Sequence, residues 1–345
     1  MRMFDLKGTV LSLNDPNIIS LLNSIELYKG KTLGVEKVKK VEDLVRIAKH
    51  SGTISSCSLG NVFVSEEEEM SLLDEDRPAA TMQEHIVKGY KSAIEHIDEV
   101  YKYQPFDLSF ISTLHYFMYK DYNPEFGGKF KDTQNYIQEV MPDGSFSTVL
   151  VPAAPEEVIP LLDNLIYQFN ECARDEMINK LLLINTFIFD FLCIHPYNHG
   201  NGRVSRLILH FLLKKFGYSI DDYFSIAYTM QRKIGNYIDA FKASADKWSD
   251  GENNYAPYVT FMLKMILESY NKLDYILTIG ELEGTADDKV LKIITDSATP
   301  ISKNVVQNVL YCTSFATIEK SLAKLVKEEK IQLINKGRYS KYFRM

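Results

Sequence analysis

The spacing of apolar positions along the chain predicts a mostly helical protein. In several segments apolar residues recur every three or four positions, as they do on the buried face of an amphipathic helix. Residues 52–77 are rich in Gly and Ser and then in acids, so we expect a loop there, and residues 1–34 are only weakly periodic. On this pattern we expect helices over residues 38–51, 81–103, 109–120, 156–170, 175–194, 204–216, 226–245 and 255–282.

Two segments predict short hairpins instead. Alternating apolar residues over 136–152, around Pro142-Asp143-Gly144, favour a hairpin within the helical body. Near the C-terminus, strands over 331–335 and 339–344 flank Lys336-Gly337-Arg338 and follow helices at 288–296, 303–310 and 316–329. This order is typical of a winged helix-turn-helix unit, with a small dimerising or scaffolding domain as the alternative.

The elements divide the chain into three predicted regions. Residues 1–105 form an N-terminal helical region, residues 106–280 a helical core that carries the hairpin, and residues 286–345 the winged helix-turn-helix. A polar linker at residues 280–288 separates the last two regions. The expected fold class is therefore mainly α, with one small β-hairpin in the body.

Composition narrows the class of protein. The 345 residues are 46% hydrophobic and 25% charged, which excludes fibrous and disordered chains. The most apolar run, residues 181–194, is too short to span a bilayer, and the N-terminus is polar. The four cysteines contain no CxxC pair, so we expect ordinary thiols in a cytoplasmic protein with no membrane partner.

Charge is distributed unevenly. Residues 301–345 hold nine basic and three acidic residues, a net charge of +6 on a chain whose total is −7. A basic C-terminal block on an acidic body indicates a module with its own partner, either DNA or an acidic protein. Lys320, Lys324 and Lys327 form a basic stripe beside apolar Ile318, Leu322 and Leu325.

The segment from His195 to Arg206 has the densest chemistry. Gly200, Asn201 and Gly202 can adopt positive φ angles, so that successive amides point into one concavity at the start of the next helix. Such a helix N-terminus is suited to a phosphate group. Arg203 and Arg206, three residues apart, share the first turn and suit a di- or triphosphate. His195 ends the preceding helix, where a neutral imidazole can take a proton from a hydroxyl, although a purely structural histidine is the alternative.

This segment resembles the motif of the Fic family, which reads His-Pro-Phe-x-Asp/Glu-Gly-Asn-Gly-Arg-x-x-Arg. The chain departs from it at two positions, where Tyr197 replaces Phe and His199 replaces the acid. Residues 127–131 and 134–137 resemble the family's Gly-x-Phe/Tyr-Arg stretch before a flap, and residues 136–152 resemble that flap. Residues 237–241 loosely resemble the family's segment near the nucleotide base. A C-terminal winged helix is a common companion.

The resemblance implies transfer of AMP from ATP to a Ser, Thr or Tyr hydroxyl of a target protein bound along the flap. His195 would be the base. The 200–202 loop and Arg203 would hold the α- and β-phosphates, and Arg206 would meet the γ-phosphate. Tyr237 would lie near the nucleotide base. Relatives also transfer UMP, phosphate or, from CDP-choline, phosphocholine, so the donor stays open. A degenerate nucleotide-binding regulator that acts on DNA through its winged helix is the alternative function, and a homodimer is an open alternative for the assembly.

Two departures affect the expected site. The family's acid holds Mg²⁺, for which the imidazole of His199 is a poor ligand. The site would then bind Mg²⁺ through phosphates and water alone, use Mn²⁺ or Zn²⁺, or work without metal. The second departure lies in Ser55–Asn61, which resembles an inhibitory segment, with Leu59 where a Glu would pair with Arg206. We expect no such inhibition here, unless residues 52–65 are an unrelated Ser-rich loop.

Overall fold

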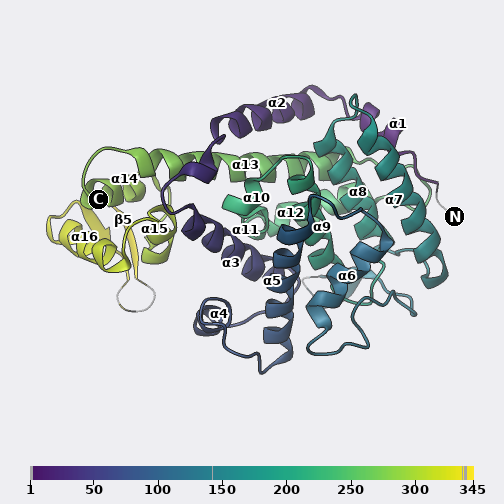
Figure 1. Ribbon diagram of the computed structural model, residues 1–345, viewed down its shortest axis with the longest axis horizontal. Helices are drawn as coiled ribbons and strands as arrows, with labels where there is room; N and C mark the ends of the chain where they lie inside the picture. Colours follow the sequence, from purple (N-terminus) through teal and green to yellow (C-terminus); the bar gives the residue numbers. More distant parts are fainter. Residues whose placement is uncertain (1–2, 142, 336, 338–339) are drawn as a thin grey trace.

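The computed structural model describes residues 3–141, 143–335, 337 and 340–345, and most of them lie in helices (Figure 1). The helices of the body are α1 Leu6–Ser12, α2 Pro16–Lys31, α3 Val41–Leu59, α4 Glu66–Leu73, α5 Met82–Val100, α6 Leu108–Tyr119, α7 Val158–Arg174, α8 Lys180–Ile194, α9 Asn201–Lys215, α10 Ile220–Tyr223, α11 Ile226–Gln231, α12 Ile234–Ala245 and α13 Ala256–Glu281. The predicted mainly α fold is confirmed.

Helix α8 forms the centre of the body. Its side chains from Leu181 to Ile194 are all buried, because the helix is apolar around its whole circumference. Helices α1, α7, α9 and α13 pack around it. Its one buried acid, Asp190, accepts hydrogen bonds from the Trp248 indole (2.8 Å) and the Tyr255 hydroxyl (3.0 Å). The helix ends at His195, whose positive φ of 54° stops the helical path.

The prediction of a loop over residues 52–77 is wrong for residues 52–59 and 66–73, which are helical, and holds for 60–65 and 74–77. Helix α3 continues to Leu59, and α4 begins after a capping box made by Ser65 and Glu68. The buried face of α3 continues through small residues, Thr53, Ser55, Ser56 and Cys57, which a search for large apolar residues does not detect. The weakly periodic N-terminus also forms helices: α1 contacts α7 and α8, and α2 lies along α13 (Figure 1).

The helix predicted over residues 226–245 is broken in two. The chain turns at Arg232 and Lys233 between α11 and α12, and Lys233 forms an ion pair with Glu268 of α13. The predicted hairpin is confirmed: β1 (Ile137–Val140) and β2 (Phe146–Leu150) pair antiparallel, with Val140 opposite Phe146. We keep the name flap for residues 136–152, of which Pro142 lies outside the described residues.

The C-terminal region forms a small unit at one end of the molecule (Figure 1). It comprises α14 (Ala286–Asp296), β3 (Ile301–Ser302), α15 (Lys303–Val309), α16 (Phe315–Lys327), β4 (Ile331–Leu333) and β5 (Lys341–Arg344). The strands form an antiparallel sheet in the order β3-β5-β4, and β3 was not predicted. Of the predicted wing, Lys336 and Arg338 lie outside the described residues.

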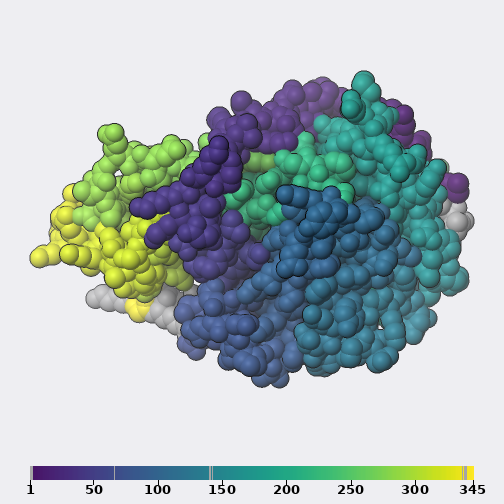
Figure 2. Space-filling view, viewed as in Figure 1, coloured from purple at the N-terminus to yellow at the C-terminus, as the bar shows by residue number. Residues whose placement is uncertain are grey.

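This unit has its own core and also touches the N-terminal region. Ile318, Leu322 and Leu325 of α16 are buried in the core, as the predicted stripe required. The turn before α16 meets the chain just before α3, where Cys312 Sγ approaches the Lys39 carbonyl at 3.1 Å. Figure 2 shows the two segments in contact on the surface. None of the helices in the described part of the chain has the length and hydropathy needed to cross a bilayer.

Candidate active site

His195 lies where α8 meets the loop that leads into α9. Its Nδ1 lies 3.2 Å from the Leu192 carbonyl, which can only accept, so Nδ1 carries the proton and Nε2 keeps its lone pair. Burial lowers the pKa of His195 to about 4, and the charges of Lys131 and His199 act in the same direction. At neutral pH the imidazole is therefore uncharged and can accept a proton at Nε2.

The loop after His195 is closed by one side chain. Asn201 accepts from the Tyr197 N–H at 2.9 Å and donates to the Tyr197 carbonyl at 2.7 Å. Because its side chain is bound to Tyr197, the role in nucleotide binding that we predict for Asn201 would rest on its backbone N–H. Gly200 caps α9 with a φ of 85°, and a Cβ there would lie 2.9 Å from the Tyr119 hydroxyl.

Helix α9 presents free amides to this loop. Val204 N–H bonds to the Gly200 carbonyl at 2.9 Å and is the first amide of the helical ladder. The N–H groups of Asn201, Gly202 and Arg203 therefore precede the ladder, together with the positive end of the helix dipole. Such a helix start suits an anion, and nucleotide binding by residues 200–202 stays a prediction.

Arg203 and Arg206 are both buried beside this helix end, with 5% and 7% of their surface exposed. Arg203 donates to the Tyr119 hydroxyl (2.9 Å), and its Nε and Nη1 have no hydrogen-bond partner in the described part of the chain. Arg206 donates to the hydroxyl and the carbonyl of Ser56, at 2.7 and 2.8 Å. All these partners are neutral, so among the described residues the two buried cations lack the counter-charge that an anionic ligand would supply.

Gly202 makes room for the second arginine. A Cβ at Gly202 would lie 3.3 Å from Arg206 Nη1, so the guanidinium folds back over the first turn of α9. Arg206 is thereby held between its own helix and the end of α3.

A buried histidine that the sequence pattern did not single out supports the loop. His115 Nδ1 accepts from the Gly128 N–H at 2.8 Å, so its Nε2 carries the proton and donates to the His199 carbonyl at 3.1 Å. Its ring stacks on Tyr197, with centroids 3.9 Å apart. Burial lowers the pKa of His115 to about 4, which keeps this neutral tautomer in place. No sequence signal could reveal a contact between residues 84 positions apart.

Two further predicted residues lie around the arginines. Tyr237, on α12, has ring contacts with Tyr258 and Phe261, with centroids 6.2 and 5.8 Å apart. Leu59 is the last residue of α3, one turn after Ser56, and packs partly buried against the core. Helix α3 therefore does reach the arginines, and Ser56 takes up the guanidinium of Arg206.

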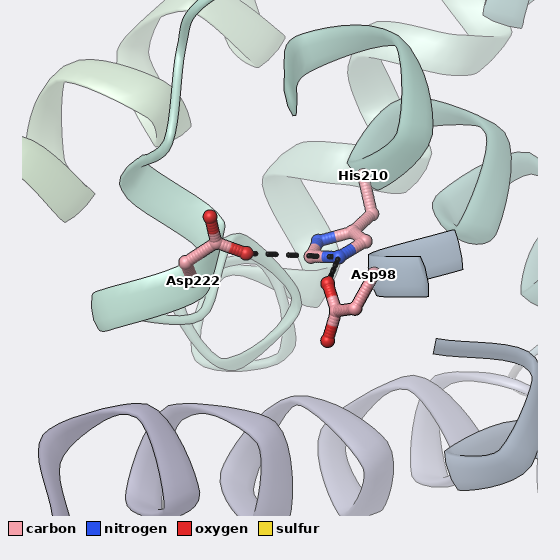
Figure 3. A group of neighbouring side chains, drawn as sticks. All are labelled: Asp98, His210 and Asp222. Carbon is pink, nitrogen blue, oxygen red and sulfur yellow. Dashed lines mark hydrogen bonds and ion pairs between the residues drawn. The ribbon is translucent and has the colours of Figure 1, made fainter. Parts of the chain in front are cut away.

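The predicted metal position does not fit Mg²⁺. His199 is exposed, with an imidazole where a carboxylate would be needed, so we derive no step through a protein-bound metal. A different group, Asp98, His210 and Asp222, has ligand atoms within 4.8 Å of one another (Figure 3). Lys214 already binds both carboxylates, at 2.6 and 2.7 Å.

His210 itself argues for an ion-pair network at this second group. Its Nδ1 lies 2.9 Å from Asp221 and its Nε2 3.4 Å from Asp98. With a carboxylate at each nitrogen, both nitrogens carry protons and neither has a lone pair for a metal. Burial lowers the pKa of His210, but the hydrogen bonds to Asp221 and Asp98 outweigh it and raise the pKa to about 10.

Part of the chain, including this site, is similar to a known protein family. Residues 105–213 match the sequence profile of the Fic/DOC family. No curated protein sequence matches this chain.

Solved structures of similar fold cover most of the chain. A Fic family protein from Desulfovibrio desulfuricans G20 has a TM-score of 0.61 at 15% identity, covering 96% of each chain. A Fic domain containing signaling protein from Bacteroides thetaiotaomicron VPI-5482 has a TM-score of 0.61 at 20% identity, covering 78% of this chain and 100% of that one. Fic-1 (residues 134–508) from C. elegans has a TM-score of 0.57 at 14% identity, covering 76% and 73%. The His195–Arg206 site lies inside the residues that match the Fic/DOC family profile.

Proposed function

We propose that this protein transfers AMP from ATP to a hydroxyl side chain of a target protein. The observation that carries the proposal is the pair of buried guanidinium groups, Arg203 and Arg206, which have only neutral hydrogen-bond partners at the start of α9. Two such cations beside three free amides suit a polyphosphate better than a single carboxylate. The match of residues 105–213 to the Fic/DOC family supports nucleotidyl transfer, and we propose ATP as the donor.

His195 supplies the acid–base chemistry of the proposed reaction. The target hydroxyl oxygen forms a bond to the α-phosphorus, and the bond from the α-phosphorus to the oxygen that bridges to the β-phosphate breaks. Nε2 of His195 takes the hydroxyl proton, and pyrophosphate leaves with the electron pair. Arg203 and the amides of residues 200–202 offset the charge that develops on the phosphates, and Arg206 contacts the terminal phosphate.

The flap is the proposed docking edge for the target. In the described part of the chain its sheet consists of β1 and β2, so a bound peptide can add as a third strand. Glu139 of β1 forms an ion pair with Lys242 of α12 (2.7 Å), which ties the flap to the body. Phe146, 68% exposed, and Tyr136, 55% exposed, offer apolar contacts beside this edge.

Intact-mass measurement after incubation with ATP and Mg²⁺ or Mn²⁺ tests the proposal. We expect the protein, or an added target, to gain the mass of one AMP. His195→Ala should lower the rate by about 10²–10⁴ and leave ATP binding within a few-fold, because the imidazole acts on the proton rather than on the phosphates. Full activity of His195→Ala would contradict the assignment of the base.

Two controls identify the donor. Parallel incubations with UTP and CDP-choline should give no mass gain if ATP is the donor. Thermal shift with each nucleotide gives an independent ranking of affinity. A mass gain with CDP-choline and none with ATP would replace AMP transfer by phosphocholine transfer on the same His195.

We infer that the C-terminal unit is a winged helix that binds DNA, which makes a DNA-linked regulator the second candidate function. The supporting observation is α16, whose apolar face is buried in the unit while Lys320, Lys324 and Lys327 are exposed. A regulator of this kind would bind nucleotide at α9 without transferring AMP. The mass measurement above separates the two functions, because only the enzyme labels a protein.

A further inference from the structure

Lys131 lies in the segment between α6 and the flap. It is buried beside the loop that joins α8 to α9, with 4% of its surface exposed. Its backbone N–H donates to the Pro196 carbonyl at 2.8 Å. Its Nζ donates to the Ile194 carbonyl at 3.2 Å and to Asn135 Oδ1 at 3.0 Å. One residue thus binds the peptide carbonyls on both sides of His195.

The backbone of His195 needs such support. With φ 54° and ψ 61°, it adopts the left-handed conformation, which is unfavourable for a residue with a side chain. A conformation of this kind persists only where the surroundings hold it in place. Among the described residues, the hydrogen bonds of His195 itself are local and go to Phe191 and Leu192 of α8. Lys131 adds hydrogen bonds to the residues on either side of His195 from a distant part of the chain.

The position of the ammonium group is also favourable. The Ile194 carbonyl lies at the C-terminal end of α8, where the helix dipole favours a cation. Asn135, the second acceptor, donates in turn to the Tyr197 carbonyl at 3.1 Å. Lys131 and Asn135 therefore form a clamp along the loop from Ile194 to Tyr197.

We propose that Lys131 is a positioning residue for His195, which it holds for proton transfer by binding the carbonyls of Ile194 and Pro196. The side chain does not need to touch the substrate for this role. The proposal rests on the proposed function for its kinetic readout only, because the clamp itself is a matter of geometry.

The charge of Lys131 adds a consequence that can be measured. It opposes protonation of His195, in the same direction as burial and His199. Burial lowers the pKa of Lys131 itself to about 8, and Glu157, the carboxylate that acts on it, opposes this shift. Below about pH 8 the ammonium is charged, so its removal should raise the pKa of His195.

NMR titration of labelled histidine in the full chain tests this without any activity. We expect the midpoint of His195 to rise in Lys131→Met and to stay near its original value in Lys131→Arg. The matched control is Lys129→Met, which removes an exposed lysine two residues away that pairs with Glu125. If Lys131→Met does not fold, Lys131→Gln serves in its place, since its amide can donate to the Ile194 carbonyl without a charge.

Kinetics give the second readout. In Lys131→Met the kcat for AMP transfer should fall at least tenfold, with the KM for ATP within about threefold, and the acid limb of the pH profile should move to higher pH. Lys131→Arg should restore most of kcat. A His195 midpoint and a kcat unchanged from the parent protein would overturn the proposal. If the parent protein transfers no AMP, the proposed function fails while the titration still decides the role of Lys131.

Discussion

The two buried arginines of the site differ in what holds them. Two nitrogens of Arg206 donate hydrogen bonds to Ser56. Two nitrogens of Arg203 have no partner in the described part of the chain. Free donors on a buried cation favour an incoming phosphate, since a charge-assisted hydrogen bond contributes roughly 1.5–3 kcal/mol. Arg203 is therefore the residue on which we expect the affinity for nucleotide to depend most.

Arg203→Ala should weaken ATP binding by about tenfold or more, which corresponds to about 1.4 kcal/mol. The loss should be larger for ATP than for AMP, because AMP lacks the β-phosphate. Isothermal titration of the two nucleotides measures both losses. Arg174→Ala, which removes an exposed arginine on α7 paired with Glu171, is the control for a simple change of charge. Equal losses for ATP and AMP would leave Arg203 with a structural role only.

At the level of single residues, local chemistry was predictable and long-range contacts were not. Pro196 and the glycines predicted the loop, and the spacing of Arg203 and Arg206 placed both on one helix face. The contact from Arg206 to Ser56 joins residues 150 positions apart, and no local pattern signals it; the resemblance of residues 55–61 to an inhibitory segment was the indication that they lie near Arg206. No local pattern signals the contact between His115 and the loop it supports either.

Among the elements, α3 connects the N-terminal region to the phosphate site. It was predicted to end at residue 51, because Gly52 and the serines after it are poor helix formers, yet burial of their small side chains continues the helix to Leu59. Tertiary packing thus overrode a weak local preference. The resemblance of residues 55–61 to an inhibitory segment indicated that they lie near Arg206, whereas the periodicity did not.

Leu59→Glu should introduce the inhibition that we expect this chain to lack. Residues 56 and 59 lie on one face of α3, so a carboxylate at position 59 would compete with phosphate for the guanidinium that Ser56 binds. We expect the Kd for ATP to rise about tenfold or more and transfer to fall with it. Leu59→Gln, of the same size without the charge, should change both much less. ATP binding by Leu59→Glu equal to that of the parent would show that position 59 does not face the phosphates.

The network around His210 joins three helices and predicts a pH dependence of stability. His210 of α9 meets Asp98 of α5 and Asp221 of α10 (Figure 3 shows its approach to Asp98). Because the pKa of His210 is raised to about 10 from 6.5, its stabilising charge is fully present below pH 6.5 and is lost as the pH rises through 10. The pKa of Asp98 is lowered, so its contribution is lost only in strong acid.

His210→Gln should therefore lower the free energy of unfolding by about 3–5 kcal/mol near pH 6. The difference from the parent protein should shrink steadily between pH 6.5 and 10. Urea unfolding at several pH values measures it, and His85→Gln, at a histidine for which the described chain shows no ion pair, is the control. A difference that stays constant with pH would mean that His210 is neutral in the folded protein.

At the scale of the whole molecule, the body and the C-terminal unit carry opposite charge. The unit was predictable as a separate module from its basic composition and its order of elements, because both are local properties of residues 286–345. Its placement was not, because the contact between Cys312 and Lys39 joins segments that lie far apart in the sequence. Helix α16 packs against α14, α15 and β4 of its own unit, and its exposed face is where we expect a polyanion.

Not all lysines of α16 should contribute equally to DNA binding. Lys324 forms an ion pair with Asp287, whereas Lys320 and Lys327 are exposed and make no ion pair in the described part of the chain. We expect binding to duplex DNA at low salt, with log K falling linearly as log salt rises. Lys320→Glu with Lys327→Glu should reduce that slope by about 2, one unit for each lost phosphate contact. Fluorescence anisotropy over a salt series measures it, with Lys102→Glu on the body as control. Binding that is absent, or that does not depend on salt, would instead leave the face of α16 as a protein contact, because a site for DNA phosphates must release counterions.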